Sequence, residues 1–221
     1  VVGPQSYQNL PELIAKVDPV NKNKNINIDF PTIPKFDQLN ENIEERGPSA
    51  FLTIQEGCDK FCTFCVVPYT RGAEYSRPLK SIIDEAKKLI DVGVKEITLL
   101  GQNVNAWSFK GLNDQNWGLG RLIDELAKIN ELKLIRYTTS HPLDMDIELI
   151  KSHRDNKKLM PYLHLPVQSG SDNVLKMMNR KHSVKEYLNI VEKVRDYNPK
   201  IAISGDFIVG FPGEIYKDHL S

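Results

Sequence analysis

Short apolar runs alternate with helix-like segments from residue 49 onward, and this alternation limits the possible folds more than any other feature. The segments between the runs predict helices at 79–90, 119–127, about 146–153 and 183–195. Such alternation favours parallel strands joined by right-handed crossovers. We therefore predict an α/β fold, a partial (β/α) barrel truncated after about five β/α units, with an open doubly wound sheet as the alternative. The apolar runs predict five strands, at Ala50–Gln55, Lys95–Leu100, Leu134–Thr139, Tyr162–Val167 and Ile201–Val209.

The residues before this region do not share its pattern. Residues 1–17 contain a short helical pattern from Leu10 to Val17, and we interpret them as the tail of an N-terminal domain. Residues 18–48 are rich in Asn, Lys, Asp and Pro, which is typical of a connector. Residues 49–221 form the predicted core domain, which we expect to be truncated at its C-terminal end.

Charge and composition exclude several classes of protein. Lysine plus arginine total 29 and aspartate plus glutamate total 29, so overall charge gives no support for nucleic-acid binding. No apolar run is long enough to span a membrane, and no signal peptide is recognisable. We expect a cytoplasmic monomer with reduced cysteines and no membrane contact.

All three cysteines of the chain, Cys58, Cys62 and Cys65, lie within eight positions. A 4Fe-4S cluster normally takes four cysteines, so three would leave one iron open to a small molecule. Structural zinc usually needs four ligands, and the five histidines are scattered singly. The alternatives are a disulfide with a spare thiol, a partial zinc site, or ordinary buried thiols. The triplet thus favours an iron-sulfur cluster.

Polar or glycine-rich segments follow each predicted strand. The active site of a β/α barrel lies at the carboxyl ends of its strands. These segments should therefore gather around the cysteines, which follow the first strand; they are 101–103, 140–142, 168–170 and 210–214.

Cys58, Cys62, Phe64 and Cys65 resemble the signature of the radical-SAM enzymes, in which an aromatic residue precedes the last cysteine. Longer segments resemble the methylthiotransferase branch of that family, and together they span almost the whole chain. They are Gly57–Pro78, Leu99–Asn105, Thr139–Pro142, His164–Ser171 and Gly205–Glu214.

The resemblance implies that the three cysteines bind a 4Fe-4S cluster whose open iron holds S-adenosylmethionine. The implied reaction adds a methylthio group to carbon 2 of isopentenyladenosine beside the tRNA anticodon, through a 5'-deoxyadenosyl radical. The ribosomal-protein branch usually has Gln-Asp-Thr where this chain has Gln102-Asn103-Val104, which favours the tRNA branch. Another tRNA adenosine or a ribosomal protein remains the alternative substrate.

The resemblance also assigns residues around the cofactor. Arg71, Glu74 and Arg77 are expected to contact substrate or a neighbouring domain, with surface ion pairing as the alternative. Arg180-Lys181-His182 could touch RNA phosphate, or simply be solvated. No catalytic side chain is assigned. The expected cofactor contacts are Phe64, Gly101, Gln102, Asn103, Gln168, Ser169, Asp206, Val209 and Gly210.

Members of this branch use further parts and partners. A second 4Fe-4S cluster is expected in the full-length enzyme, but its ligands are absent from this sequence. An electron donor is an expected partner beside tRNA. A catalytically incomplete module that binds an iron-sulfur cluster or zinc is therefore the alternative function.

Overall fold

The computed structural model describes residues 1–3, 6–17, 25–28, 47–111 and 115–221. Three parallel strands form its main sheet in the order β1 (Ser49–Thr53), β4 (Glu96–Leu100) and β7 (Leu134–Tyr137). In this register Leu52 lies opposite Leu99, and Leu99 lies opposite Tyr137. The first three predicted strands are therefore confirmed, each slightly shorter than predicted.

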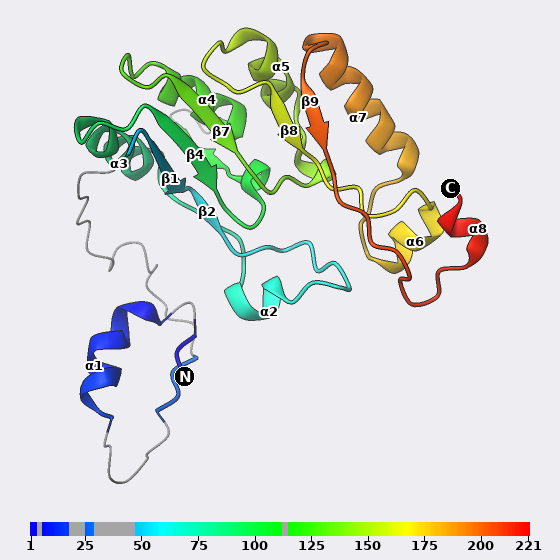
Figure 1. The fold of residues 1–221 in the computed structure, drawn as a ribbon, viewed down its shortest axis with the longest axis horizontal. Coiled ribbons are helices and arrows are strands. Elements are labelled where there is room, and N and C mark those ends of the chain that lie inside the picture. Colours follow the sequence, from blue (N-terminus) through cyan, green and yellow to red (C-terminus); the bar gives the residue numbers. More distant parts are fainter. Residues whose placement is uncertain (4–5, 18–24, 29–46, 112–114) are drawn as a thin grey trace.

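A second parallel pair, β8 (Tyr162–His164) and β9 (Ala202–Ser204), continues the curve of the main sheet (Figure 1). Ile135 joins the main sheet to the segment before β8, because its N–H donates to Lys158 O at 2.7 Å and its carbonyl accepts from Met160 N at 2.9 Å. Both the fourth and the fifth strand are shorter than predicted, ending at His164 and Ser204. Beyond them, Gln168 and Phe207 form a single parallel bridge, and Gln168 has a left-handed backbone with φ 78°.

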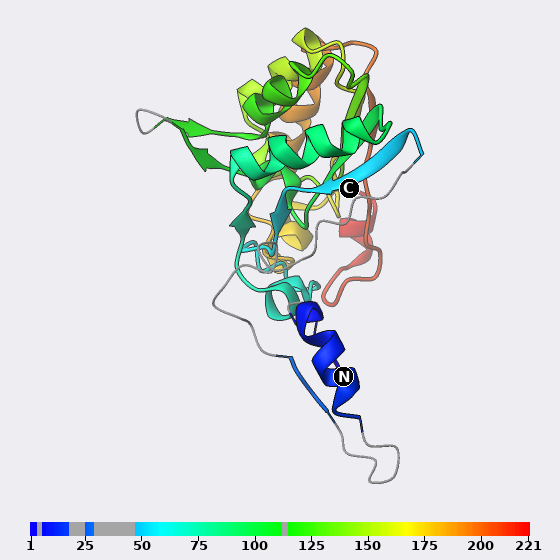
Figure 2. The ribbon, with the colours of Figure 1, turned by 90° about the vertical axis from the view of Figure 1, so that its left-hand side faces the viewer.

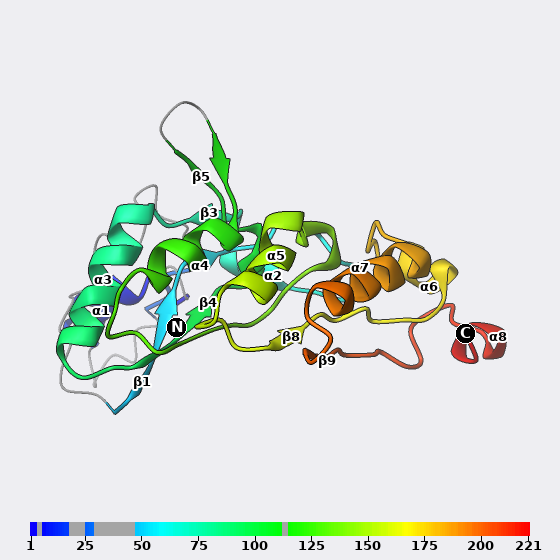
Figure 3. The same ribbon diagram turned by 90° about the horizontal axis from the view of Figure 1, so that it is seen from above.

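Four helices lie on one side of these strands: α3 (Leu79–Asp91), α4 (Leu119–Ala127), α5 (Ile147–Asp155) and α7 (Val184–Tyr197) (Figures 1 and 3). Only one face of the strands is covered in this way, so the fold is a partial barrel and not a doubly wound sheet. Apolar strand residues meet the helices to form the core. Its fully buried members include Leu52, Ile82, Ile97, Leu99, Leu122, Ile123, Leu126, Ile135 and Leu163.

The predicted capping box begins α7. Ser183 Oγ accepts from Glu186 N at 3.2 Å, and the Glu186 carboxylate accepts from Ser183 N at 2.7 Å. Ser171 likewise caps α6 (Asp172–Met177), as predicted. These caps satisfy backbone N–H groups that have no partner within the helix.

Several short elements escaped prediction, because two-residue strands show no periodicity. The antiparallel pair β2 (Gln55–Glu56) and β3 (Tyr75–Ser76) brackets the cysteine loop. The pair β5 (Phe109–Lys110) and β6 (Asn116–Trp117) extends away from the sheet (Figures 2 and 3). Further short elements within the described ranges are α2 (Val67–Arg71), α8 (Tyr216–His219) and the 3-10 helices Tyr7–Asn9, Val104–Ala106 and Pro142–Asp144.

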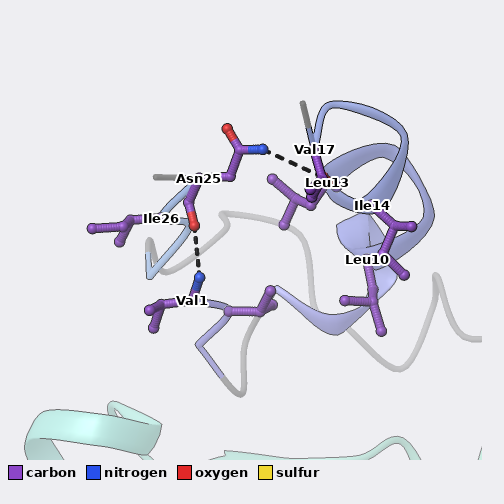
Figure 4. Close-up of a pocket in the computed structure, with 8 residues that line it drawn as sticks. Val1, Leu10, Leu13, Ile14, Val17, Asn25 and Ile26 are labelled. Atoms are coloured by element: carbon purple, nitrogen blue, oxygen red, sulfur yellow. Dashed lines mark hydrogen bonds between the residues drawn. The ribbon is translucent and has the colours of Figure 1, made fainter. Parts of the chain in front are cut away.

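The predicted N-terminal helix is present as α1 (Leu10–Ala15). The amino group of Val1 donates to Asn25 O at 2.6 Å, which closes this segment over a cavity of about 390 Å³ (Figure 4). The lining of this cavity is almost wholly apolar. Most of the predicted connector, at 18–24 and 29–46, lies outside the described residues, so the domain boundaries stay a prediction. Within the described residues, no helix has the length and hydrophobicity to cross a membrane.

Gly57 turns the chain from β2 into the cysteine loop. Its backbone is left-handed, with φ +76°, and a Cβ atom there would lie 2.0 Å from the carbonyl oxygen of Ala73. Only glycine allows both the backbone conformation and this close approach. The start of the cysteine loop is thereby fixed against the segment that leads into β3.

A buried polar pair lies among the apolar side chains behind the sheet. The Tyr137 hydroxyl and His153 Nε2 are 2.6 Å apart, and burial lowers the pKa of His153 to about 4. A protonated imidazole here would lose its hydration without gaining an anion. His153 is therefore neutral in the folded protein near pH 7.

This pair makes stability depend on pH. The pKa of His153 is lowered from 6.5 to about 4, so between these values only the unfolded chain binds the proton. We expect the free energy of unfolding to fall on acidification through this window, by up to about 1.4 kcal/mol per pH unit from this one group. H153Q should flatten the slope seen in urea unfolding, whereas Y137F, which keeps the buried imidazole, should retain it. Equal slopes in H153Q and wild type would contradict this assignment.

Substitution of Gly57 should be unusually costly. G210A is a matched control, because Gly210 has the same φ of +76° but open space where the Cβ would lie. Backbone strain, about 1–2 kcal/mol, is common to both variants. The clash with Ala73 O should lower the unfolding free energy of G57A by roughly 1–3 kcal/mol more than that of G210A. Equal losses in thermal or urea unfolding would show that the close approach is not a real constraint.

Candidate metal centre

The cysteine loop carries three free thiols. Cys62 is buried, with 8% of its surface exposed, while Cys58 and Cys65 are half-buried. Cys65 N donates to Cys62 O at 2.9 Å, which folds the second half of the triplet into a tight turn. Since no thiol is oxidised to a disulfide, all three can serve as thiolate ligands.

The number and kind of donors bear on the type of metal site. A structural zinc ion takes four ligands around one centre, and the cysteine loop supplies three thiols. In a four-iron cluster each thiolate binds a different iron atom, so three thiols leave one iron without a protein ligand. The donor set therefore fits such a cluster. Among the described residues, no three His, Cys, Asp or Glu side chains are grouped around one point.

Gln55 joins the cysteine loop to the loop after β4. Its side-chain N–H donates to Gly57 O at 2.7 Å, and its Oε1 accepts from Asn103 N at 3.0 Å. Gln102 Oε1 accepts in turn from Gly57 N at 2.8 Å. Gln55 is fully buried, and we did not predict a role for it, although an amide at the end of an apolar strand was a visible signal. Predicted Gln102 is thus occupied in holding the loop.

Asp144 ties the loop after β7 to the same place. Its carboxylate accepts from Lys60 Nζ at 2.8 Å and from Asn103 Nδ2 at 2.8 Å. Asn103 Nδ2 also donates to Glu74 at 3.1 Å, and Glu74 accepts from Asp59 N at 3.4 Å. Loops after β1, β4 and β7 are therefore joined by side-chain hydrogen bonds, as the barrel prediction required.

The C-terminal end of α6 supports the other side of the cysteine loop. Thr63 N and Oγ1 donate to the carbonyls of Met178 and Met177, at 3.1 and 3.0 Å. Asn179 Nδ2 donates to Phe61 O at 2.8 Å. The two Thr63 contacts satisfy carbonyls at the end of α6 that lack an intrahelical partner. They were not predicted, because they join residues more than a hundred positions apart.

Several buried polar atoms around the loop have no hydrogen-bond partner among the described residues. Buried polar groups are nearly always paired, so such a concentration suggests that a polar ligand binds here. Asn103 is 2% exposed, yet its Oδ1 is free to accept a hydrogen bond. The unpaired atoms of this region are Asn103 Oδ1, Ser140 Oγ, His141 Nε2, Arg180 Nε and His182 Nε2.

Protonation states follow from burial. Burial is the main cause that raises the pKa of the Cys58 thiol, although the backbone N–H of Lys60 opposes it. A metal must therefore displace a proton from Cys58. Burial, together with the nearby charge of Arg180, lowers the pKa of His141 to about 2. His141 is neutral at physiological pH and adds no charge beside the loop.

The other predicted cofactor residues lie at the carboxyl ends of the strands. Gly101 approaches Gln55 so closely that a Cβ would lie 2.5 Å from its Oε1. Gln168 N donates to Asp206 O at 3.0 Å, which joins the segments after β8 and β9. The Asp206 carboxylate lies 3.3 Å from His164 Nε2. Phe64 is 40% and Val209 68% exposed, Ser169 is buried, and Gly210 N donates to Glu214 at 2.6 Å.

The three predicted substrate or domain contacts have different surroundings. Arg71 pairs with the buried carboxylate of Glu56 at 3.2 Å. Arg77 is only 7% exposed and pairs with Glu85 at 2.6 Å. Glu74 supports the cysteine loop, as described above. Arg77 and Glu74 thus have evident structural roles. Of the two arginines, Arg71 has the more exposed side chain.

Comparisons with known proteins show the family of the chain. Residues 52–220 match the model of the radical SAM superfamily. A tRNA-2-methylthio-N(6)-dimethylallyladenosine synthase from Agrobacterium fabrum is 56% identical over 222 residues, which cover 99% of this chain and 48% of the relative. The chain thus spans about half the length of that relative.

Solved structures share the fold at low sequence identity. TsrM from Kitasatospora setae, a radical S-adenosylmethionine methyltransferase solved with cobalamin and a [4Fe-4S] cluster, has 16% identity and a TM-score of 0.58 over 84% of this chain and 34% of its own. Apo OxsB, a cobalamin-dependent S-adenosylmethionine radical enzyme, has 13% identity and a TM-score of 0.61 over 92% of this chain and 32% of its own. Since the family model covers most of the chain and the fold agrees, the chain belongs to the radical SAM superfamily.

Proposed function

We propose that this chain is the catalytic core of a methylthiotransferase that modifies carbon 2 of N6-dimethylallyladenosine, also called isopentenyladenosine, in tRNA. The observation that carries the proposal is the 56% identity with a tRNA-2-methylthio-N(6)-dimethylallyladenosine synthase, which extends over 99% of this chain. The chain covers 48% of that relative, so the reaction of the whole protein is inferred from its core.

Cys58, Cys62 and Cys65 would hold a 4Fe-4S cluster with one iron free of protein ligands. When bound, the cluster supplies the electron that cleaves S-adenosylmethionine to a 5'-deoxyadenosyl radical. The protein's part is to hold the three thiolates on one loop and to shield Cys62 from water. Gln55 and Asp144 perform the first task, because they join the cysteine loop to its neighbours.

The free acceptor of Asn103 supports a cofactor contact. An amino group of S-adenosylmethionine could donate to Asn103 Oδ1, which is buried and unpaired in the described structure. Phe64, half-exposed beside Cys65, offers an aromatic face for adenine. The ribose and adenine would lie further along the strand ends, where we propose contacts from Gly101, Gln102, Gln168, Ser169, Asp206, Val209 and Gly210.

The remaining partners are also proposals. Arg71 is the best candidate for a contact with substrate phosphate, since part of its guanidinium is exposed. The balance of 29 basic and 29 acidic residues leaves most of the RNA affinity to other parts of the protein. An external electron donor, a second cluster in the full-length enzyme, a monomeric state and a cytoplasmic location complete the proposal.

Anaerobic reconstitution with iron and sulfide tests the site. We expect about four irons per chain, a broad absorbance typical of 4Fe-4S centres, and cleavage of S-adenosylmethionine to 5'-deoxyadenosine after reduction with dithionite. Alanine at Cys58, Cys62 or Cys65 should abolish cleavage, because each thiolate binds a different iron. Serine at exposed Thr70, outside the triplet, is the control and should leave iron content unchanged.

Two outcomes would contradict the proposal. A chain that binds one zinc ion in place of iron would be a metal-binding module. A chain that forms the cluster but never cleaves S-adenosylmethionine would be an inert iron-sulfur module. In either case the fold would stand and the catalytic role would not.

A further inference from the structure

Arg180 is a buried cation beside the proposed cluster ligands. It follows α6, and the geometry of that helix end sets its position. Asn179 has a left-handed backbone, φ 58°, while Arg180 N donates to Leu175 O at 2.9 Å and Asn179 N donates to Lys176 O at 3.1 Å. This is the pattern of a Schellman C-cap, in which Asn tolerates the left-handed position. The cap ends the helix directly before Arg180. Arg180 therefore comes immediately after Met177, Met178 and Asn179, which contact the cysteine loop.

The guanidinium of Arg180 points at Cys62. Its Nη1 lies 3.6 Å from Cys62 Sγ, and its Nη2 donates to Pro166 O at 2.6 Å. Both side chains are shielded from water, since Arg180 is 5% and Cys62 8% exposed. The carbonyl of Pro166 fixes one end of the planar group, so the other end is held toward sulfur.

The charge of Arg180 is not balanced by a carboxylate among the described residues. Its Nε is also buried without a hydrogen-bond partner. A buried cation without an anion is strongly disfavoured, so the arrangement requires an anion that the polypeptide alone does not supply. The nearest ionisable rings, His141 and His182, cannot supply it, and the Arg180 charge itself contributes to lowering their pKa values. Cys62, as a thiolate, is an ionisable group in contact with the guanidinium that can supply the negative charge.

We propose that Arg180 tunes the cluster held by Cys58, Cys62 and Cys65, by donating a charge-assisted hydrogen bond to the Cys62 thiolate. Its Nε–H, which has no partner among the described residues, is left to donate to a second acceptor. This inference rests on the proposed function, because it needs the cluster.

Reduction adds one negative charge to the cluster, and a buried cation within hydrogen-bonding distance stabilises that charge. Hydrogen bonds to ligand sulfur and nearby charge are known determinants of cluster potential. Arg180 therefore makes the cluster easier to reduce. It acts through the Cys62 thiolate and takes no direct part in the reaction.

The test compares R180Q with K181Q in the reconstituted chain. Both variants remove one positive charge, but Lys181 is exposed, so its charge is screened by water. The measurement is the midpoint potential of the cluster, from the reduced-state EPR signal in an anaerobic redox titration. In R180Q we expect the reduction equilibrium to weaken by about tenfold, which corresponds to about 59 mV for one electron. K181Q should stay close to wild type.

The conservative variant R180K keeps the positive charge and changes only the shape of the group that carries it. Lysine cannot bridge Pro166 O and the Cys62 sulfur with one planar group. The midpoint potential of the cluster in R180K should therefore lie between those of wild type and R180Q. If R180Q does not retain the fold by circular dichroism, R180K and K181Q decide the question. R180Q that folds but loses iron faster than R180K would also support the hydrogen bond to Cys62.

The failure of this inference can be told from failure of the proposed function. If the wild-type chain forms no 4Fe-4S cluster, the proposed function fails and takes this inference with it. If the wild type forms the cluster and R180Q has the same potential as K181Q, Arg180 is only a structural link to Pro166. A potential in R180Q that is higher than in wild type would also overturn the inference.

Discussion

The site depends on one buried amide, that of Gln55. It donates to Gly57 O and accepts from Asn103 N, so a single side chain fixes the start of the cysteine loop against the loop after β4. The amide lies in the core, where an unpaired polar group would cost about 1–3 kcal/mol, and this penalty holds its partners in place. This link fixes the first residue of the loop, and the contacts of Lys60, Thr63 and Phe61 hold the rest of it.

The rest of the architecture makes this link possible. Parallel strands end at the same edge, so the loops after β1, β4 and β7 meet without any long insertion. Helices cover only one face of the strands (Figure 3), and the other face remains open toward polar side chains such as Tyr162 and His164. Their hydroxyl and imidazole both bond Ser204 Oγ, at 2.6 and 2.8 Å.

Much of this could be read from the sequence. The spacing of apolar residues and the helix-capping residues predicted the main strands and the helices α3, α4 and α7. They could do so because the buried face of a regular element leaves a repeating pattern in the sequence. Cysteine spacing predicted a metal centre from one short segment. The supporting contacts could not be predicted in this way. The contacts of Asn179 with Phe61 and of Arg180 with Cys62 form only when the chain has folded. Each joins residues far apart in the sequence, so no local sequence pattern predicts them. The left-handed backbone at Gln168, just past the predicted end of the fourth strand, likewise has no glycine to mark it.

The central claim is that three thiolates of one loop hold a cluster with one iron free for S-adenosylmethionine. Electron-nuclear double resonance of the reduced cluster, with the cofactor's carboxylate isotopically labelled, tests it most directly. The account predicts a hyperfine coupling from the label, because the carboxylate binds the free iron, and loss of that coupling when unlabelled cofactor replaces it. A spectrum from a fully formed cluster that shows no coupling to the bound cofactor would contradict the account.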